Sequence, residues 1–396
     1  MRTIGVVTVG RSDYGLYRPI LKRIMDEPAM ELRLIVAGMH LSPEFGLTVR
    51  EIEAEGMPIA ERIDMLVAAD TPGAIAKSMG LGTLGFAQAF ARRRPDILLL
   101  LGDRFEMHAA AVAAVPFTIP LAHIHGGEIT EGATDNAWRQ SITMLGHLHF
   151  VSTAEARRRL EQMGEEPWRV IVSGAPGLDN LKTMRLLERP ELAARIGLSW
   201  DPPPLVVTSH PVTLEYERTE WQIGELLAAL DTVGHPVVFT APNADTNGRV
   251  IRRAIEAFVA RHAATRLVEH LGTQVYFSLM AHAGAMAGNS SSGLIEAPSF
   301  ELPTVNIGTR QEGRLRAANV IDVGYRREEI RAAIRQALDP SFRRRLRGMV
   351  NPYGDGRATE RIVRRLKEVP LDQRLISKRF VDLALLTPQV PVGSPA

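Results

Sequence analysis

Short apolar runs rich in β-branched residues alternate with stretches of helical periodicity along almost the whole chain, and this alternation limits the fold most strongly. It is typical of βαβ units, in which parallel strands form a sheet covered by helices on both faces. In the first half we expect strands at 3–9, 32–37, 97–101, 118–124, 147–151 and 169–173, and helices at 16–26, 73–93, 105–115, 135–145 and 153–163. In the second half we expect strands at 205–208, 236–240, 266–269, 284–287, 303–307 and 319–322, and helices at 216–231, 247–262, 291–298 and 327–338.

The chain has 396 residues, more than one hydrophobic core usually holds, so two domains are expected. The alternation breaks from about Asp179 to Pro204, which makes this stretch the expected linker. The sequence therefore predicts an α/β protein with two Rossmann-like doubly wound domains, at 1–180 and 200–356, that face each other across a cleft. In such sheets ligands bind beyond the carboxyl ends of the strands, so polar residues at strand ends are the candidates for a site.

Composition narrows the classes of function. The chain has no cysteine, which excludes disulfides, thiolate metal sites and a cysteine nucleophile, and which fits a reducing cytoplasm. The first residues enter a predicted strand without a signal-peptide layout, and no apolar run is long enough to span a bilayer. The net charge is only +2 and no long basic block occurs. We therefore expect a cytoplasmic protein with neither a membrane nor a nucleic-acid partner.

A Gly/Ser loop, residues 288–293, joins a predicted strand to a predicted helix and has the sequence Gly-Asn-Ser-Ser-Ser-Gly. Its N–H groups, its hydroxyls and the positive end of the helix dipole suit a phosphate, although the same residues also serve as ordinary helix caps. Glu296 lies one turn further on, where it could accept hydrogen bonds from a ribose. Arg310 and Arg314 follow the next strand and could flank a diphosphate, or could instead pair with surface acids.

Carboxylates collect at the strand ends of the first half. Asp103 follows the buried strand 97–101, where desolvation or a like charge can raise the pKa of a carboxyl group. Glu128 follows the next strand, and Asp135 and Arg139 lie one helical turn apart beyond it. The structural alternatives are that Asp103 caps the next helix and that the last two form a surface pair. Together these residues would place three carboxylates and an arginine at one edge of the cleft.

Three histidines and an arginine complete the candidates. His123 and His125 alternate along a predicted strand, but no helical His-Glu-x-x-His pattern accompanies them, so a zinc site is not favoured. His210 closes the first strand of the second half, where a histidine could act as acid or base near neutral pH. Arg11 follows the first strand and could reach a phosphate, while its neighbours Ser12 and Asp13 could cap the next helix.

Five segments together resemble the hydrolysing UDP-N-acetylglucosamine 2-epimerase family, and the likeness covers about residues 1–370. The segments are 11–15 (Arg-Ser-Asp-Tyr-Gly), 102–106 (Gly-Asp-Arg-Phe-Glu), 123–128 (His-Ile-His-Gly-Gly-Glu), 208–213 (Thr-Ser-His-Pro-Val-Thr) and the 288–293 loop. Residues 125–132 look like the hydrolysing branch, because the non-hydrolysing branch usually carries Glu-Ala-Gly-Leu-Arg there. The resemblance implies a glycosyltransferase-B architecture, in which the last helix, within 357–396, returns to the first domain.

The resemblance also implies a reaction: UDP-N-acetylglucosamine and water give N-acetylmannosamine and UDP, a step toward sialic-acid-type sugars. It implies no metal or redox cofactor and a homo-oligomer, a dimer. The residues that match the family's catalytic positions are Asp103, Glu128, Asp135, Arg139 and His210. Those that match its UDP-binding positions are Arg11, Ser290, Ser291, Ser292, Gly293, Glu296 and Arg314.

Inversion at C2 with loss of UDP is best achieved by elimination across C1–C2 to a glycal, followed by addition of water. A carboxylate would remove the C2 proton, and arginines with the helix start would neutralise the leaving diphosphate. Four alternatives remain open: the same chemistry on UDP-2,4-diacetamido-2,4,6-trideoxyglucose of the legionaminic acid route, a non-hydrolysing epimerase, a glycosyltransferase of the same fold, and a sensor that binds without turnover. The tail after Pro370 carries little signal.

Overall fold

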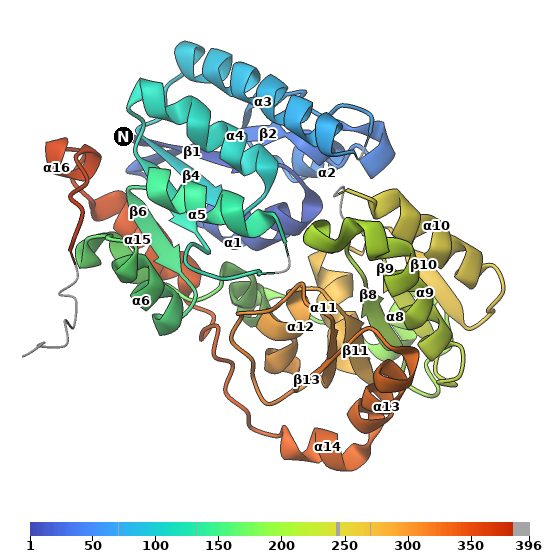
Figure 1. The fold of residues 1–396 in the computed structure, drawn as a ribbon. Helices are drawn as coiled ribbons and strands as arrows, with labels where there is room; N and C mark the ends of the chain where they lie inside the picture. The colour runs from blue at the N-terminus through green and yellow to red at the C-terminus, as the bar shows by residue number, and fades with distance from the viewer. Residues whose placement is uncertain (70, 132, 243–245, 270, 383–396) are drawn as a thin grey trace, which may run out of the picture.

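The computed structural model describes residues 1–382 except 70, 132, 243–245 and 270. Gly132, the last residue of the 125–132 segment, and tail residues 383–396 therefore lie outside the described part. In that part, thirteen strands form two all-parallel sheets, which stand in two lobes side by side (Figure 1). The predicted fold class is confirmed: both lobes are doubly wound α/β units.

The N-terminal lobe is built on a sheet of seven strands in the order β3-β2-β1-β4-β5-β6-β7. The strands are β1 (Arg2–Thr8), β2 (Met30–Ala37), β3 (Ile59–Ile63), β4 (Ile97–Leu101), β5 (Leu121–Ile124), β6 (Leu148–Val151) and β7 (Val170–Val172). The helices are α1 (Arg11–Met25), α2 (Val49–Ala54), α3 (Pro72–Arg92), α4 (Phe105–Ala114), α5 (Asp135–Leu145), α6 (Ala154–Gln162) and α7 (Asn180–Thr183). The strand order reverses between β1 and β4, where ligands of such sheets bind.

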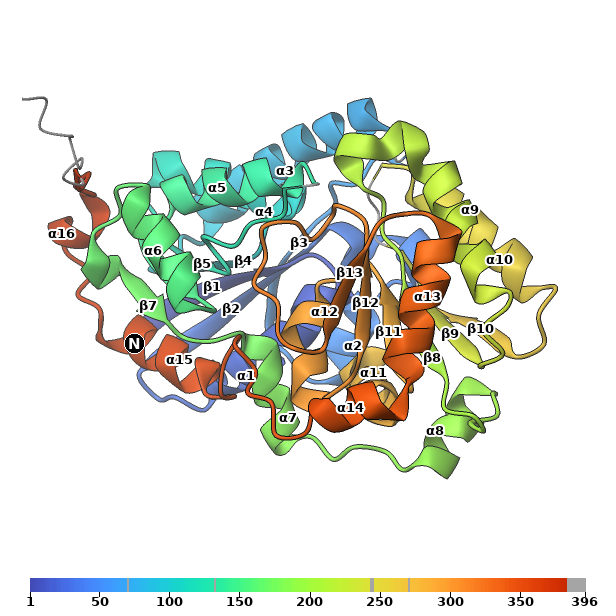
Figure 2. The same ribbon diagram turned by 60° about the horizontal axis from the view of Figure 1, so that its bottom comes forward.

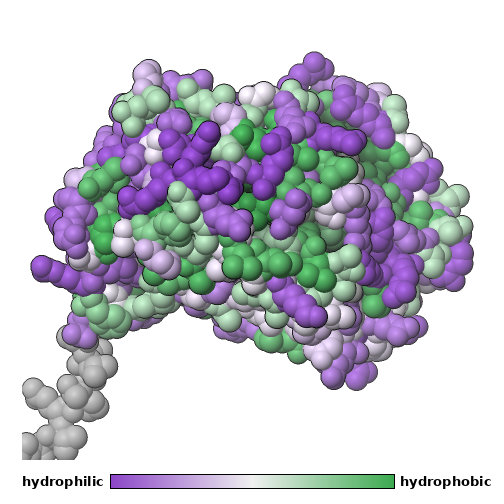
Figure 3. Space-filling view, turned by 90° about the horizontal axis from the view of Figure 1, so that it is seen from above, coloured by the Kyte–Doolittle hydropathy of each residue, from purple (hydrophilic) through white to green (hydrophobic). Residues whose placement is uncertain are grey.

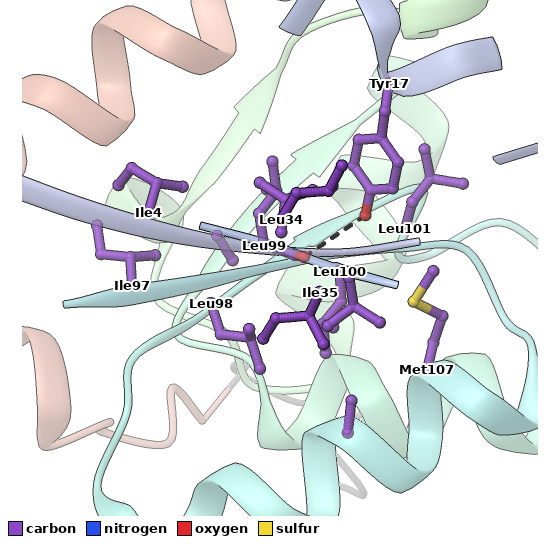
Figure 4. Packing of buried hydrophobic residues seen from close by; sticks show 14 of the residues in the cluster. Ile4, Tyr17, Leu34, Ile35, Ile97, Leu98, Leu99, Leu100, Leu101 and Met107 are labelled. Atoms are coloured by element: carbon purple, nitrogen blue, oxygen red, sulfur yellow. Dashed lines mark hydrogen bonds between the residues drawn. The ribbon is translucent and has the colours of Figure 1, made fainter. Parts of the chain in front are cut away.

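The central strand β4 explains why this lobe folds as it does. All five of its residues, Ile97 to Leu101, are buried, because helices cover both faces of a parallel sheet. Figure 4 shows how side chains of β1, β2 and β4 pack on one another, with Tyr17 of α1 lying over β4. The Tyr17 hydroxyl donates a hydrogen bond to the Leu99 carbonyl at 3.5 Å. An apolar strand of this kind ends abruptly at Gly102-Asp103, which places the carboxylate at the sheet edge.

The C-terminal lobe contains a sheet of six strands in the order β10-β9-β8-β11-β12-β13. The strands are β8 (Leu205–Thr208), β9 (Val237–Thr240), β10 (Thr265–Val268), β11 (Ala285–Gly288), β12 (Thr304–Ile307) and β13 (Val320–Val323). The helices are α8 (Arg189–Ile196), α9 (Thr219–Leu230), α10 (Gly248–Val259), α11 (Gly272–His282), α12 (Ser292–Ile295), α13 (Arg327–Leu338) and α14 (Pro340–Arg345). The strand order here reverses between β8 and β11, next to the Gly/Ser loop.

The chain then crosses back to the first lobe. Helix α15 (Ala358–Glu368) lies against α1 (Figure 2), and its Ile362 and Leu366 belong to the hydrophobic core of the N-terminal lobe. The short helix α16 (Gln373–Ile376) follows. Buried Arg169 holds this region by donating to the carbonyls of Arg374, Leu375 and Ser377. We retain 1–180 with the last helices, and 200–356, as the proposed division into domains.

Several sequence expectations need correction. Strand β3 and helix α11 were not expected, since β3 is partly polar and α11 has no clear amphipathic period. The helix expected at 291–298 is only the four-residue α12 followed by a 3₁₀ turn at Ala297–Phe300, because Pro298 cannot continue the hydrogen-bond ladder. The expected linker contains α8, whose Leu192 packs in the core of the C-terminal lobe. None of the described helices is long and apolar enough to cross a membrane.

Candidate active site

A cleft of about 1100 Å³ lies between the carboxyl edges of the two sheets and is lined by residues of both lobes. Every predicted site residue except Gly293 lines it. The cleft therefore brings the carboxylates of the first lobe and the Gly/Ser loop of the second into one space.

Asp103 is held by Arg139, one of the largest fully buried side chains in the described chain. The Arg139 guanidinium pairs with the Asp103 carboxylate and also donates to the Glu128 carbonyl at 3.0 Å and to the Thr130 hydroxyl at 2.8 Å. The surface-pair alternative for Arg139 is wrong, since the side chain is only 1% exposed. The capping alternative for Asp103 is also wrong, because α4 begins from Arg104 as its N-cap. Arg139 thus orients the Asp103 carboxylate and supports the loop that carries Glu128.

Glu128 is buried in a set of donors. Its Oε1 atom lies 2.6 Å from His125 Nδ1 and accepts a hydrogen bond of 2.7 Å from the Ser152 hydroxyl. Its Oε2 atom lies 3.4 Å from a guanidinium nitrogen of Arg314, which comes from the other lobe. Burial alone would raise the pKa of Glu128, but the charges of His125 and Arg314, with the hydrogen bonds, lower it to about 2. This carboxylate is therefore an anion across the physiological range.

A second ion pair joins the lobes. Arg310, in the loop after β12, lies 3.6 Å from Asp135 at the start of α5. Arg310 also donates to the Asn289 carbonyl at 3.2 Å, so the same side chain touches the Gly/Ser loop. The two arginines that follow β12 thus contact carboxylates of the opposite lobe, Arg310 at Asp135 and Arg314 at Glu128. Both would be within reach of a group that lies between the lobes.

His210 is fixed by the Gly/Ser loop. The side-chain amide of Asn289 accepts a hydrogen bond from the backbone N–H of His210 at 2.7 Å and donates one to the backbone carbonyl of His210 at 2.8 Å. Burial, with the charges of Arg310 and Arg104 nearby, lowers the pKa of His210 well below its usual value. The ring is therefore neutral at pH 7. It can exchange hydrogen bonds, but the lowered pKa means that the ring does not readily take up a proton.

The Gly/Ser loop is shaped by Gly288, whose φ is +127° and whose added Cβ would lie 1.9 Å from the Thr208 carbonyl oxygen. The N–H groups of Ser290 and Ser291 donate no hydrogen bond to the described residues, and both residues line the cleft. Gly293 lies behind the cleft: its N–H donates to the Ser290 carbonyl, and a Cβ there would clash with Thr304. Gly293 is therefore the one expected UDP-binding residue that does not line the cleft, and its position is explained by close packing against Thr304.

Glu296 and Arg11 line the cleft from different lobes. Glu296 is buried, and burial raises its pKa although Ser292 and the charges of His125 and Arg314 act in the other direction. Arg11 is paired with Glu51 of α2 at 2.9 Å and keeps a quarter of its side chain exposed. Its neighbour Asp13 does not cap α1, because it accepts hydrogen bonds from Thr8 and Val9 of the preceding strand.

The two histidines of the β5 segment have different surroundings. His123 is fully buried, with Nε2 2.7 Å from the Gly102 carbonyl. His125 lies just beyond the strand at φ +66° and lines the cleft. Sequence reasoning considered His125 only as a metal ligand and did not consider Ser152 or Thr130, although Ser152 directly follows β6 and could have been identified from that position. No group of three or more possible metal ligands occurs among the described residues.

The sequence profile of the family described as UDP-N-acetylglucosamine 2-epimerase matches residues 22–367. A protein of Legionella pneumophila named "UDP-N,N'-diacetylbacillosamine 2-epimerase (hydrolyzing)" is 38% identical over 96% of this chain and 99% of its own length. A Campylobacter jejuni protein named "GDP/UDP-N,N'-diacetylbacillosamine 2-epimerase (hydrolyzing)" is also 38% identical, with the same coverage. The crystal structure of the Neisseria meningitidis UDP-GlcNAc 2-epimerase bound to UDP-GlcNAc superposes with a TM-score of 0.79 at 17% identity, covering 92% of this chain and 99% of that one.

Two Rossmann-like lobes that meet at an interdomain cleft define the glycosyltransferase-B class of fold. The family profile and the two relatives then narrow this class, because they match nearly the whole chain. The chain belongs to the hydrolysing UDP-N-acetylglucosamine 2-epimerase family.

Proposed function

We propose that the protein converts a UDP-linked 2-acetamido sugar and water to UDP and the free sugar epimerised at C2. UDP leaves by elimination across C1–C2, and water then adds to the resulting glycal. The observation that carries this proposal is the pair of contacts between lobes, Arg314 to Glu128 at 3.4 Å and Arg310 to Asp135 at 3.6 Å. They place the cations that suit a diphosphate next to the carboxylates that suit proton transfer at the adjoining sugar.

The roles follow from the positions. Ser290 and Ser291 would offer their N–H groups to the diphosphate, and Arg314 would neutralise the charge that grows on it as the C1–O bond breaks. Ser292 and Glu296 would form hydrogen bonds with the ribose of UDP, and Arg11 would contact UDP from the N-terminal lobe. Because α12 has only four residues, the backbone donors and arginines contribute more to this site than a helix dipole does.

On the sugar side, Asp103, Glu128 and Asp135 would supply the carboxylates. Each has a guanidinium partner, which favours its ionised form and hence its use as a base or as a stabiliser of positive charge at C1. Arg139 is a positioning residue, since it holds Asp103 from a fully buried place. His210, neutral in its setting, would hydrogen-bond to the departing phosphate or to the sugar.

For the sugar itself we favour 2,4-diacetamido-2,4,6-trideoxyglucose, the compound that the two relatives' names call N,N'-diacetylbacillosamine. Apolar side chains of the N-terminal lobe that line the cleft support this choice: Met39, Met65, Leu66, Leu101 and Phe105. A C6 methyl and a C4 acetamido group would bury more favourably there than two hydroxyls. UDP-N-acetylglucosamine is the second candidate, and a Neisseria meningitidis relative with that name is 29% identical over 97% of this chain.

The test is to incubate the pure protein with each UDP-sugar in ²H₂O and, separately, in H₂¹⁸O. We expect UDP release together with a free sugar that carries one deuterium at C2 and ¹⁸O at C1, and a larger kcat/KM for the trideoxy sugar. Label on the UDP phosphate would mean P–O cleavage and would contradict the mechanism. A UDP-linked epimer would indicate a non-hydrolysing enzyme, and a larger kcat/KM for UDP-N-acetylglucosamine would reverse the choice of sugar.

We also propose that a second copy of this chain binds the face formed by α3, α4 and α5. These adjacent helices carry apolar side chains that are 39–64% exposed: Leu81, Leu84, Val112 and Met144. Among the 21 residues of α3 only Lys77 and Arg92 are charged, and the only carboxylate of α4, Glu106, is buried. The face seen from above in Figure 3, where α3 and α4 lie, has a broad hydrophobic area.

A face with few charges suits self-association, because identical side chains meet near a two-fold axis and like charges there would repel. The helices span roughly 30 Å by 25 Å at 1.5 Å per residue and about 9 Å between axes, close to the roughly 800 Å² per partner of a stable dimer. We expect a dimer by light scattering at micromolar concentration and a monomer for a Leu84→Glu/Val112→Glu variant. Leu214→Glu, which changes an exposed leucine of the other lobe, is the matched control and should leave the dimer intact. A monomeric wild type would contradict this proposal.

A further inference from the structure

His125 stands out because it pairs with a carboxylate on one side and lines the cleft on the other. Its Nδ1 atom lies 2.6 Å from Glu128 Oε1, and the Ser152 hydroxyl donates to the same oxygen at 2.7 Å. The three side chains come from one sheet edge, because His125 directly follows β5 and Ser152 directly follows β6. The His125 N–H donates to the Phe150 carbonyl at 3.0 Å, which fixes the backbone on which the ring stands.

The rest of the ring is free to meet a substrate. Among the described residues, the ring of His125 makes no hydrogen bond other than that with Glu128, and the side chain lines the cleft. Glu296 of the opposite lobe is close enough for the His125 charge to lower its pKa. The charged and titratable groups around the ring are therefore Glu128 and His123 of its own lobe, and Arg314 and Glu296 of the other. This arrangement, in which a carboxylate holds one imidazole nitrogen and leaves the other for chemistry, is typical of catalytic histidines.

The proposed reaction needs a proton donor that the carboxylates do not readily supply. Inversion at C2 requires that the proton removed from one face of the sugar be replaced by a proton on the opposite face, so two different groups must act. Asp103, Glu128 and Asp135 are each paired with a guanidinium, and such pairing favours the anion over the acid. His210 is neutral in its setting. His125 lines the cleft, and the Glu128 carboxylate lies 2.6 Å from its Nδ1 atom, where it would pair with an imidazolium.

The geometry points to His125 as the acid that protonates C2 of the glycal; Glu128 would hold the ring at Nδ1 in addition to its role on the sugar side, and Ser152 would be a positioning residue. This inference rests on the function proposed above. In this step the Nε2–H bond breaks and the proton forms the new C2–H bond with the electron pair of the C1–C2 double bond. The water oxygen bonds to C1, and the spare proton of the water goes to a carboxylate. His125 then regains a proton from solvent. The sum is UDP-sugar and water giving free sugar, UDP and one proton.

The first test compares His125→Gln with wild type and separates the two halves of the reaction. The wild type should release UDP and free sugar in equal amounts, and failure to do so would refute the proposed function itself. We expect His125→Gln to release UDP within about tenfold of the wild-type rate while free-sugar formation falls about 10²–10⁴-fold. The vinylic C1 proton of the accumulating glycal should then appear in the NMR spectrum. The matched control is His262→Gln, which alters an exposed His–Asp pair of the other lobe with a 2.7 Å contact and should behave as wild type.

Two results would overturn the role of His125 while leaving the proposed function intact. One is wild-type sugar formation by His125→Gln, and the other is an equal loss of UDP release and sugar formation with no glycal. Glu296→Gln tests the competing donor, and glycal accumulation in that variant alone would transfer the role to Glu296. Should His125→Gln fail to fold, Ser152→Ala is the alternative variant, because it leaves the His125–Glu128 pair in place. It should slow free-sugar formation about fivefold, as expected for one lost hydrogen bond, and again accumulate glycal; the absence of glycal from this variant would count against the inference.

Discussion

Replacement of Glu128 by glutamine measures how strongly the cleft holds this carboxylate as an anion. The substitution preserves the size of the side chain and leaves an oxygen that can still accept a hydrogen bond from Ser152. It removes the negative charge that faces Arg314 at 3.4 Å and His125 at 2.6 Å. Its effect on stability is therefore electrostatic rather than a consequence of a cavity.

The pKa of Glu128 gives the expected magnitude. The pKa is about 2 in the folded protein against an ordinary value of 4.5, a difference of about 2.5 units. At 1.36 kcal/mol per unit this corresponds to about 3 kcal/mol of folding free energy. Because the folded-state pKa is the lower one, the contribution is complete above about pH 5 and is lost as the pH falls toward 2. We expect Glu128→Gln to be about 3 kcal/mol less stable than wild type at pH 7 and nearly equal to it near pH 2.

The assay is urea denaturation followed by tryptophan fluorescence at several pH values between 2 and 7. Glu191→Gln is the control, because Glu191 forms an exposed pair with Arg195 at 2.8 Å, and such pairs contribute only about 0.3–0.5 kcal/mol. If the difference in free energy of unfolding between wild type and Glu128→Gln were the same at every pH, the charge of Glu128 would not be its cause. The electrostatic explanation of this site would then be wrong.

Three further predictions follow from other buried groups. Burial raises the pKa of Asp13 to about 6, so its ionised form opposes folding above that pH; we expect Asp13→Asn to stabilise the protein by roughly 1–3 kcal/mol at pH 8 but not at pH 4, as measured by denaturation at both. Gly288→Ala would place a Cβ 1.9 Å from the Thr208 carbonyl, so calorimetry should show UDP binding weakened at least tenfold, whereas Gly224→Ala, with open space around it, should bind UDP normally. Arg169→Gln removes donors to three carbonyls of the C-terminal segment, so limited proteolysis should cleave that segment faster than in wild type; equal rates would refute its clamping role.

Much of the fold could be predicted because it depends on neighbours close in sequence. The run Ile97–Leu101 is apolar throughout, so it had to be a strand buried on both faces, and Gly102-Asp103 had to end it at the sheet edge. The same reasoning placed Glu128, His210 and the Gly/Ser loop at strand ends, and the family resemblance rested on those segments. Prediction from the sequence failed where the local pattern is weak, as in the partly polar strand β3. It also failed where a single residue sets the length of a helix, as Pro298 does after α12.

Only the tertiary structure decided which of these groups meet. Arg310 pairs with Asp135 and Arg314 with Glu128, partners that are 175 and 186 residues apart in the numbering, and the pairing depends on how the two lobes are held. Likewise Ser152 and His125 share one carboxylate oxygen because β5 and β6 are neighbours in the sheet, which no periodicity reveals. Periodicity and turn residues act over a few residues and so determine the elements. Ion pairs and shared hydrogen bonds act over a few ångströms, and those distances exist only after the sheets have formed and the lobes have packed.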